Sequence, residues 1–231
     1  MDVDAYLAER SSLVNRYLDE VVPPASESPT SLHAAMRHLL FPGGKRLRPA
    51  LAFAGCEAAG APVEMALPAA AAVELVHIYS LIHDDLPCMD DDDERRGRPT
   101  VHVAFGEAVA VLAGDGLLAR AFGVLADPSV GVEPQRQLAA LRELSRAADS
   151  RNLVGGQADD LALGAGEVDA AAIESIHLRK SAALIAASVL AGAGLGGADS
   201  PLLERLRCFA EAVGVAFQIA DDLLDQESGE P

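Results

Sequence analysis

Two clusters of aspartates carry the clearest chemical signal in the sequence. The first lies in residues 84–93 and contains Asp84 and Asp90, and the second contains Asp221 and Asp225. The i and i+4 spacing of the second pair would place both carboxylates on one face of a helix, where like charges destabilise the helix unless a cation lies between them. Both clusters follow apolar stretches, and carboxylates in such a setting suit Mg²⁺ that keeps some of its waters and bridges to phosphate. Either cluster alone could instead be a solvated acidic run.

Basic groups that could hold phosphate are few, and the sequence has only two lysines, Lys45 and Lys180. Residues 43–49 read Gly-Gly-Lys-Arg-Leu-Arg-Pro, a glycine turn with cations before a predicted helix, and the backbone N–H groups of such a turn favour phosphate. Lys180 is expected within an apolar helix, where an unpaired lysine would be costly, so it requires an anion. Because both lysines fall in candidate phosphate sites, the sequence predicts a site for diphosphate and metal.

Further basic residues accompany the first acidic cluster. Arg95 and Arg96 follow it, and His77 precedes Asp84 by about two helical turns along roughly the same face. A single histidine in a helix is more often structural than functional, and that alternative stays open for His77.

Composition restricts the class of protein. The net charge is −17, which disfavours binding to nucleic acid or to anionic lipid. The three cysteines include no Cys-x-x-Cys pair, which argues for a reducing compartment and against a disulfide framework or a zinc site. We see no signal peptide and no uninterrupted apolar run of about 18 residues, and therefore expect a cytoplasmic protein without a membrane span.

Helical periodicity covers nearly the whole chain, whereas alternating strand patterns are essentially absent. No linker or internal repeat divides the sequence, so residues 1–231 are expected to form one all-α domain, a bundle of long helices. Pro, Gly and Asp residues mark the expected helix ends. The predicted helices, with approximate bounds, cover residues 7–21, 32–40, 65–86, 105–126, 133–163, 169–195 and 201–225, and one more begins near Pro49.

These segments together resemble the trans-isoprenyl diphosphate synthases, the family of farnesyl and geranylgeranyl diphosphate synthases. The resemblance runs from about Leu32 to Asp225, with its motifs in the family's order and with the first Asp-rich motif in the form that has two extra residues. The combination of motifs is highly specific. Besides the glycine turn and the Asp-rich motifs, the matching segments are residues 95–97, 102–108, 112–115, 155–161 and 180–185.

The resemblance implies an isoprenoid synthase fold, with helices around a central cavity, and a condensation of isopentenyl diphosphate with an allylic diphosphate. It implies three Mg²⁺ ions in the active site, two bound by Asp84 and Asp90 and one by Asp221. It also implies that the allylic diphosphate is held by Arg95, Lys180 and Gln218, and isopentenyl diphosphate by Lys45, Arg48, His77 and Arg96. Ser181, a further substrate-binding position, keeps the hydroxyl group of the Thr that is commoner in the family.

Farnesyl diphosphate is the product that the sequence favours. Tyr79 precedes Asp84 by about 7.5 Å along the helix axis, where a large ring could close the floor of the cavity. In the family, a bulky residue at this position accompanies short products. An ordinary core tyrosine is the other interpretation, and residues 87–90, Pro-Cys-Met-Asp, also occur in members that form geranylgeranyl diphosphate, which is the alternative product.

Functions of other kinds compete with this one. A non-catalytic partner subunit would usually lack the Asp-rich motifs, and both are present here. A terpene cyclase shares Asp-rich helices but binds only one diphosphate, which leaves Lys45 and Arg48 without a role. The family continues past its second Asp-rich motif with further helices, whereas this sequence ends at Pro231, so we expect a domain that lacks them. By resemblance we also expect a homodimer, built through the apolar helix 105–126.

Overall fold

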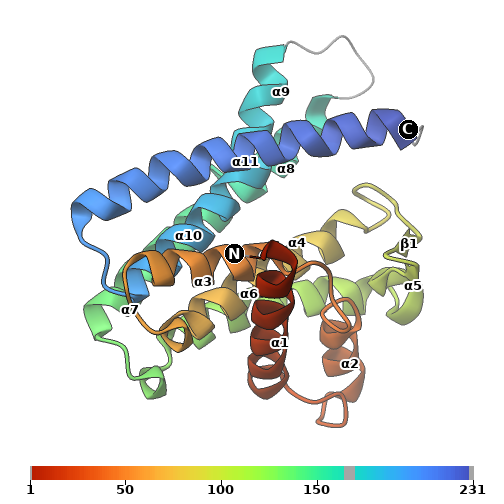
Figure 1. The fold of residues 1–231 in the computed structure, drawn as a ribbon. Coiled ribbons are helices and arrows are strands. Elements are labelled where there is room, and N and C mark those ends of the chain that lie inside the picture. The colour runs from red at the N-terminus through yellow and green to blue at the C-terminus, as the bar shows by residue number, and fades with distance from the viewer. Residues whose placement is uncertain (1, 164–169, 229–231) are drawn as a thin grey trace. The chain divides into compact units, whose positions relative to one another are not determined.

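The described part of the chain is almost entirely helical (Figure 1), which confirms the predicted all-α class. The structure is a computed structural model that describes residues 2–163 and 170–228. Within these residues the only strands are β1 (Glu94–Arg95) and β2 (Arg98–Pro99), an antiparallel hairpin that the sequence patterns did not predict. Its turn residues, Arg96 and Gly97, both have positive φ, as two-residue hairpin turns of the right twist require.

The helices group into two compact units. The first unit comprises Met1–Ala50 and Leu67–Gly131, and the second comprises Leu51–Ala66 and Val132–Pro231. The single domain over residues 1–231 and the central cavity therefore stay predictions.

Helix α4 forms the core of the first unit. Its residues from Pro68 to Ile82 are nearly all buried, because α6 packs along it and α1 contacts it. Helix α2 packs on α6 in turn (Figure 1), and α4 ends at Asp84, the first residue of the acidic cluster. The helices of this unit are α1 (Val3–Val21), α2 (Thr30–His38), α4 (Leu67–Asp84), α5 (Val101–Phe105), α6 (Glu107–Ala126) and the short η2 (Pro128–Val130), and α3 (Leu47–Ala58) begins in it.

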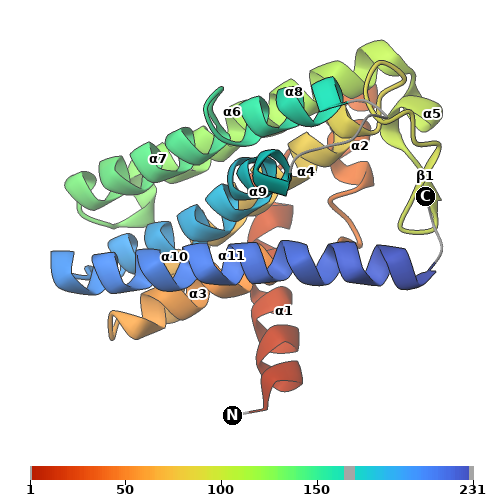
Figure 2. The same ribbon diagram turned by 90° about the horizontal axis from the view of Figure 1, so that it is seen from above.

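Helix α10 forms the core of the second unit. It packs against α7 and α11, and Figure 2 shows α10 and α11 running side by side. Gly192 permits a close backbone approach, since a Cβ there would lie 1.9 Å from the carbonyl oxygen of Ala52. The elements of this unit are η1 (Val63–Ala66), α7 (Pro134–Ala148), α8 (Leu153–Leu163), α9 (Ala170–His177), the π-helix η3 (Leu178–Ala182), α10 (Ala183–Leu195) and α11 (Ser200–Ser228).

Three predicted helices differ from the observed ones. The helix predicted over 133–163 is two helices, because the side chain of Asp149 accepts hydrogen bonds from the N–H groups of Arg151 and Asn152, at 2.8 and 3.1 Å, and starts α8 anew. The helix predicted over 105–126 begins only after Gly106, whose φ is +88°. The helix predicted over 169–195 contains a π turn between α9 and α10.

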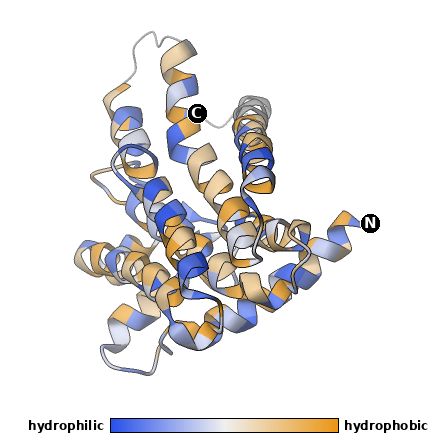
Figure 3. Cartoon of the chain, turned by 90° about the vertical axis from the view of Figure 1, so that its left-hand side faces the viewer, coloured by the Kyte–Doolittle hydropathy of each residue, from blue (hydrophilic) through white to orange (hydrophobic). Residues whose placement is uncertain are grey.

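Three helical stretches are long and apolar enough to cross a membrane by length and composition, which the absence of uninterrupted apolar runs did not anticipate. They are Val63–Asp84, Glu107–Ala126 and Ala171–Leu195, and their apolar windows are 72%, 39% and 67% buried within the protein. Hydrophobic and hydrophilic residues are mixed along the helices in Figure 3. The stretch Glu107–Ala126, which is α6, thus leaves much of its apolar surface uncovered.

Candidate active site

The first acidic cluster lies at the C-terminal end of α4, where the chain folds back on itself. The backbone N–H of Asp90 donates to the carbonyl oxygen of Asp84 over 2.8 Å. This hydrogen bond brings the two predicted metal ligands to one turn, despite the extra residues between them. Asp84 is half-buried and Asp90 is exposed. The negative end of the α4 dipole adds to the local demand for a cation.

The residues present fit a magnesium ion that is bound together with phosphate. Among the described side chains, no three His, Cys, Asp or Glu residues gather into a preformed metal site. Mg²⁺ usually takes only one or two carboxylates from the protein and completes its shell with waters and substrate phosphates. Asp221, the predicted third ligand, and Gln218 belong to the part of α11 whose side chains are outside the described residues.

Asp85 differs from its neighbours because its side chain is fully buried. Its Oδ1 accepts a hydrogen bond from Nε of Arg95 at 2.5 Å, while Nη2 of Arg95 donates to Asp92 at 3.0 Å. Burial raises the pKa of Asp85, and the charge of Arg95 lowers it in part. Two carboxylates therefore hold the guanidinium of Arg95 in place.

Basic residues from two segments gather near His77 of α4. Burial lowers the pKa of His77 well below its usual range, and the charges of nearby arginines, Arg48 foremost and then Arg96, lower it further. Arg46 and Arg95 contribute in the same direction. The glycine turn and the β1–β2 hairpin thus bring their cations to the same region of the first unit. His77 itself is uncharged at neutral pH and offers hydrogen bonds only.

The two glycines of the turn make room for two arginines. A Cβ at Gly43 would lie 2.2 Å from Nη2 of Arg46, and a Cβ at Gly44 would lie 2.7 Å from Nη2 of Arg96. Burial lowers the pKa of Arg96, and the charge of Glu74 opposes this effect. The remaining predicted cations of this turn, Lys45 and Arg48, are exposed and half-buried, respectively.

In the second unit, Lys180 has the anionic partner that its sequence context required. Its Nζ donates to Oδ2 of Asp160 at 2.6 Å, and Nη2 of Arg179 donates to Oδ2 of Asp159 at 2.5 Å. Lys180 and the half-buried Ser181 lie in the π-helix η3, a type of turn that occurs frequently at functional sites.

Helix α8 approaches this π turn closely. A Cβ at Gly156 would lie 2.6 Å from the backbone nitrogen of Lys180. The next residue, Gln157, is buried, and both polar atoms of its side chain lack a hydrogen-bond partner within the described part of the chain. Sequence reasoning included Gln157 and Asp160 in a motif but assigned them no contact. Their positions in that motif were the signal that could have pointed to them.

Tyr79 lies inside the first unit with only 8% of its surface exposed. Its ring meets that of His83 edge to face, with centroids 5.1 Å apart. Burial raises the pKa of the Tyr79 hydroxyl, and the charges of Asp84 and Asp115 raise it further. The ring therefore lies near the acidic end of α4, and its role as a product ruler stays a prediction.

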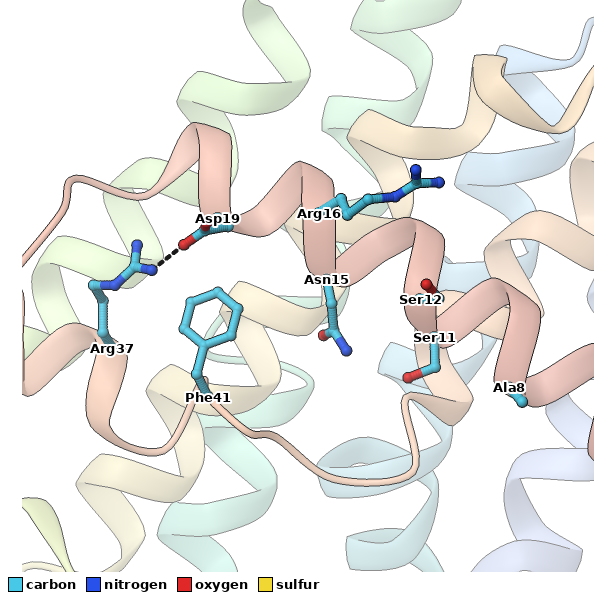
Figure 4. Close-up of a pocket in the computed structure, with 8 residues that line it drawn as sticks. All are labelled: Ala8, Ser11, Ser12, Asn15, Arg16, Asp19, Arg37 and Phe41. Carbon is cyan, nitrogen blue, oxygen red and sulfur yellow. Dashed lines mark hydrogen bonds and ion pairs between the residues drawn. The ribbon is translucent and has the colours of Figure 1, made fainter.

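A separate surface groove runs beside α1, and none of the predicted site residues lines it. Arg37 stacks on the ring of Phe41, 4.6 Å from its centroid, and pairs with Asp19 (Figure 4). Asn15 projects from α1 in the same region. The lining residues are Ala8, Ser11, Ser12, Asn15, Arg16, Asp19, Arg37 and Phe41.

Comparison with known proteins identifies the family. The family model described as polyprenyl synthetase matches residues 29–230. Among curated proteins, the chain is 48% identical over 229 residues to the large subunit 1 of a heterodimeric geranylgeranyl pyrophosphate synthase of Arabidopsis thaliana, covering 97% of this chain and 61% of that protein. It is also 48% identical over 221 residues to a geranylgeranyl pyrophosphate synthase of Capsicum annuum, covering 95% and 59%. The chain thus spans about three fifths of the length of these relatives, 61% and 59%.

Solved structures show the same fold. An FPP/GFPP synthase from Zymomonas mobilis superposes with a TM-score of 0.92 at 40% identity, over 97% of this chain and 82% of that one. A geranylgeranyl pyrophosphate synthetase from Pyrococcus horikoshii has a TM-score of 0.90 at 33% identity, over 100% and 71%. These likenesses confirm the predicted isoprenoid synthase fold. By family match, sequence identity and fold, this chain belongs to the polyprenyl synthetase family.

Proposed function

We propose that this chain acts as a prenyl diphosphate synthase that joins isopentenyl diphosphate to an allylic diphosphate. The observation that carries the proposal is the arrangement of the first unit. There, cations from the glycine turn and from the hairpin gather beside α4, whose end carries two carboxylates on one turn. Such a site can bind two diphosphates and a divalent ion, whereas a terpene cyclase needs to bind only one.

In this proposal, different residues of the chain bind the two substrates. Lys45, Arg48 and Arg96 bind isopentenyl diphosphate, and His77 donates a hydrogen bond to it. Arg95, Lys180 and Gln218 bind the allylic diphosphate, with Ser181 beside Lys180. Asp84, Asp90 and Asp221 would hold Mg²⁺, which supplies positive charge to the leaving diphosphate.

The proposed reaction needs no protein nucleophile. The allylic C–O bond breaks, the electron pair leaves with diphosphate, and the double bond of isopentenyl diphosphate attacks the resulting carbocation. The departing diphosphate then takes the proton that is lost. Arg95 and Lys180 would stabilise the charge that develops on this diphosphate, and an apolar surrounding would keep water from the cation.

Farnesyl diphosphate is the product that we propose, because the large, buried ring of Tyr79 lies near the predicted metal ligands. Geranylgeranyl diphosphate is a second candidate, since the similar proteins of Arabidopsis thaliana and Capsicum annuum carry that name. We further propose a cytoplasmic location and a homodimer.

The assay that tests the function supplies the chain with isopentenyl diphosphate, geranyl diphosphate and Mg²⁺ and identifies the products by chain length. We expect a prenyl diphosphate product whose yield falls by orders of magnitude with Asp84→Ala, while the circular dichroism spectrum is unchanged. A folded chain that binds neither diphosphate and forms no product would overturn the proposal and favour a non-catalytic partner subunit.

The same assay tests the product. Tyr79→Ala should lengthen the product by at least one isoprene unit, because a smaller side chain would remove the proposed floor. Tyr79→Phe keeps the ring and serves as the matched control, with the parent's product. An unchanged product from Tyr79→Ala would remove the basis for farnesyl diphosphate.

A further inference from the structure

A buried ion pair lies directly beneath the glycine turn. Arg46 is 3% exposed and Glu74 is 2% exposed, and Nη1 of Arg46 donates to Oε1 of Glu74 at 2.5 Å. Arg46 also donates from Nη2 to the carbonyl oxygen of Leu40 at 2.5 Å and from Nε to Oδ1 of Asn15 at 2.9 Å. One side chain thus joins the turn to α1, to the segment that follows α2 and to α4.

These contacts hold the turn in an unusual backbone conformation. Arg46 has a φ of +51°, which is uncommon for a residue with a side chain and is kept only where the surroundings impose it. Gly43 accommodates the guanidinium, since any Cβ there would collide with it at 2.2 Å. The conformation of the turn therefore depends on the hydrogen bonds that hold Arg46 in place.

Glu74 links the hydrogen bonds of Arg46 to the arginines that lie near His77. It lies on α4 one helical turn before His77, so its position fixes the turn relative to that histidine. Its charge also acts on Arg96 of the hairpin turn. Because Glu74 and Arg46 are almost completely buried, neither can reach a bound substrate in this arrangement.

We propose that Arg46 and Glu74 are positioning residues that lock the glycine turn onto α4 and so set the affinity for isopentenyl diphosphate. This inference rests on the proposed function of the site. It differs from a general role in stability, because it concerns one of the two substrates only. Lys45 and Arg48 flank Arg46 in the chain, whereas the allylic side of the proposed site is built from other residues.

The decisive variant is the double substitution Arg46→Met with Glu74→Leu. Breaking one half of a buried ion pair leaves a buried charge, whereas replacing both halves by apolar residues of similar size is often neutral for stability. The fold should therefore survive while the turn loses its anchor. Glu74→Gln is the second variant and should act in the same direction with a smaller effect. Asp19→Asn is the matched control, since it breaks the exposed pair with Arg37 in the same unit.

The measurement is titration calorimetry of the full chain with isopentenyl diphosphate and, separately, with geranyl thiodiphosphate and Mg²⁺, alongside thermal unfolding. We expect the double variant to weaken isopentenyl diphosphate binding roughly tenfold, as substitutions that act without touching a ligand can do. Binding of the allylic analogue should change less than about twofold, and the control should bind both ligands as the parent does.

Each of the other outcomes contradicts either the inference or the proposed function. A folded double variant with parental affinity for isopentenyl diphosphate overturns the inference, and so does an equal loss of both ligands, which would indicate a general structural role. If the double variant does not fold, the same readings apply to Glu74→Gln. A parent chain that binds neither ligand overturns the proposed function instead, so the two failures are distinguishable.

Discussion

At the scale of single residues, the site depends as much on buried acids as on the cations beside them. Asp85 and Glu74 are the buried carboxylates of the first unit, and each grips an arginine at 2.5 Å. The aspartates of the first Asp-rich motif therefore have different roles. Asp84 and Asp90 lie at the end of α4, while Asp85 positions Arg95.

His77 gives a prediction about acid stability. The unfolded chain takes up a proton at this residue with a pKa near 6.5, whereas burial and the neighbouring arginines hold the pKa of folded His77 well below that value. Below about pH 6.5 the unfolded state therefore binds more protons, and stability falls with falling pH by up to about 1.4 kcal/mol per pH unit.

His77→Gln should remove this part of the pH dependence. Urea unfolding at pH 7.5 and 5.5 should show a larger loss of stability in the parent than in the variant. Equal losses would mean that His77 takes up a proton as readily in the folded chain as in the unfolded one.

The two lysines give a prediction about substrate affinity. Losing one charge-assisted contact costs about 1.5–3 kcal/mol, so Lys45→Ala should raise the KM for isopentenyl diphosphate roughly ten- to hundredfold. Lys180→Ala should instead raise the KM for the allylic substrate, and it leaves the negative charge of Asp160 unpaired. Adding Asp160→Asn to Lys180→Ala should therefore recover part of the lost affinity.

Steady-state kinetics with each substrate varied in turn would check this assignment. The Lys180–Asp160 pair is partly exposed, with side chains 26% and 41% accessible. Lys180→Ala, alone or with Asp160→Asn, should therefore change the free energy of unfolding by no more than about 1 kcal/mol. If Lys45→Ala affected only the allylic substrate, the two sites would be reversed.

At the scale of the elements, periodicity predicted where helices exist but not where they break. Residues 149–152 read Asp-Ser-Arg-Asn, and the helix breaks there because the side chain of Asp149 accepts hydrogen bonds from the N–H groups of Arg151 and Asn152. The π turn at Leu178–Ala182 carries the same residue pattern as an α-helix, so spacing alone cannot distinguish the two. The hairpin at Glu94–Pro99 is too short for a strand pattern to register.

The candidate site was predictable to a similar degree. The motifs identified Asp84, Lys45 and Lys180, because their residue types and spacing suit metal and phosphate. Glu74, the partner of Arg46, and Asp160, the partner of Lys180, were not assigned, because ion pairs between segments distant in the sequence arise only from packing. A glutamate inside an apolar helix gives no sign of which arginine it will meet.

Two glycines of α10 allow a prediction about how closely this helix packs. A Cβ at Gly192 would lie 1.9 Å from the carbonyl oxygen of Ala52, whereas a Cβ at Gly194 would meet no atom within 4 Å. Gly192→Ala should force α10 away from α3 and destabilise the protein by about 1–3 kcal/mol. Gly194→Ala should be neutral or stabilise it by about 0.4–1 kcal/mol, because alanine has less freedom to lose on folding.

Chemical unfolding of these two single variants compares the same substitution at positions two residues apart in one helix. Only Gly192→Ala is predicted to lower the free energy of unfolding. Equal effects would mean that the close approach between Gly192 and Ala52 does not limit packing.

At the scale of the whole molecule, the net charge of −17 opposes self-association, so a homodimer needs an interface with few charges. Helix α6 offers one, since its exposed positions follow a helical repeat and are mostly small or apolar. Leu112 is 55% exposed and Val111 is 40% exposed on this helix. The exposed positions along the stripe are Ala108, Val111, Leu112, Asp115, Ala119, Gly123 and Ala126.

Leu112→Glu should therefore convert a dimer into a monomer. In a symmetric interface the new charge would be present in both copies, and it would be removed from water on association, which costs far more than the lost apolar contact alone. Leu138→Glu on α7 is the matched control, because Leu138 is also a strongly exposed leucine, at 58%, but lies outside the stripe. Sedimentation velocity at micromolar concentration should show the parent and Leu138→Glu as dimers and Leu112→Glu as a monomer. A parent chain that sediments as a monomer would contradict the homodimer, and a dimeric Leu112→Glu would place the interface away from α6.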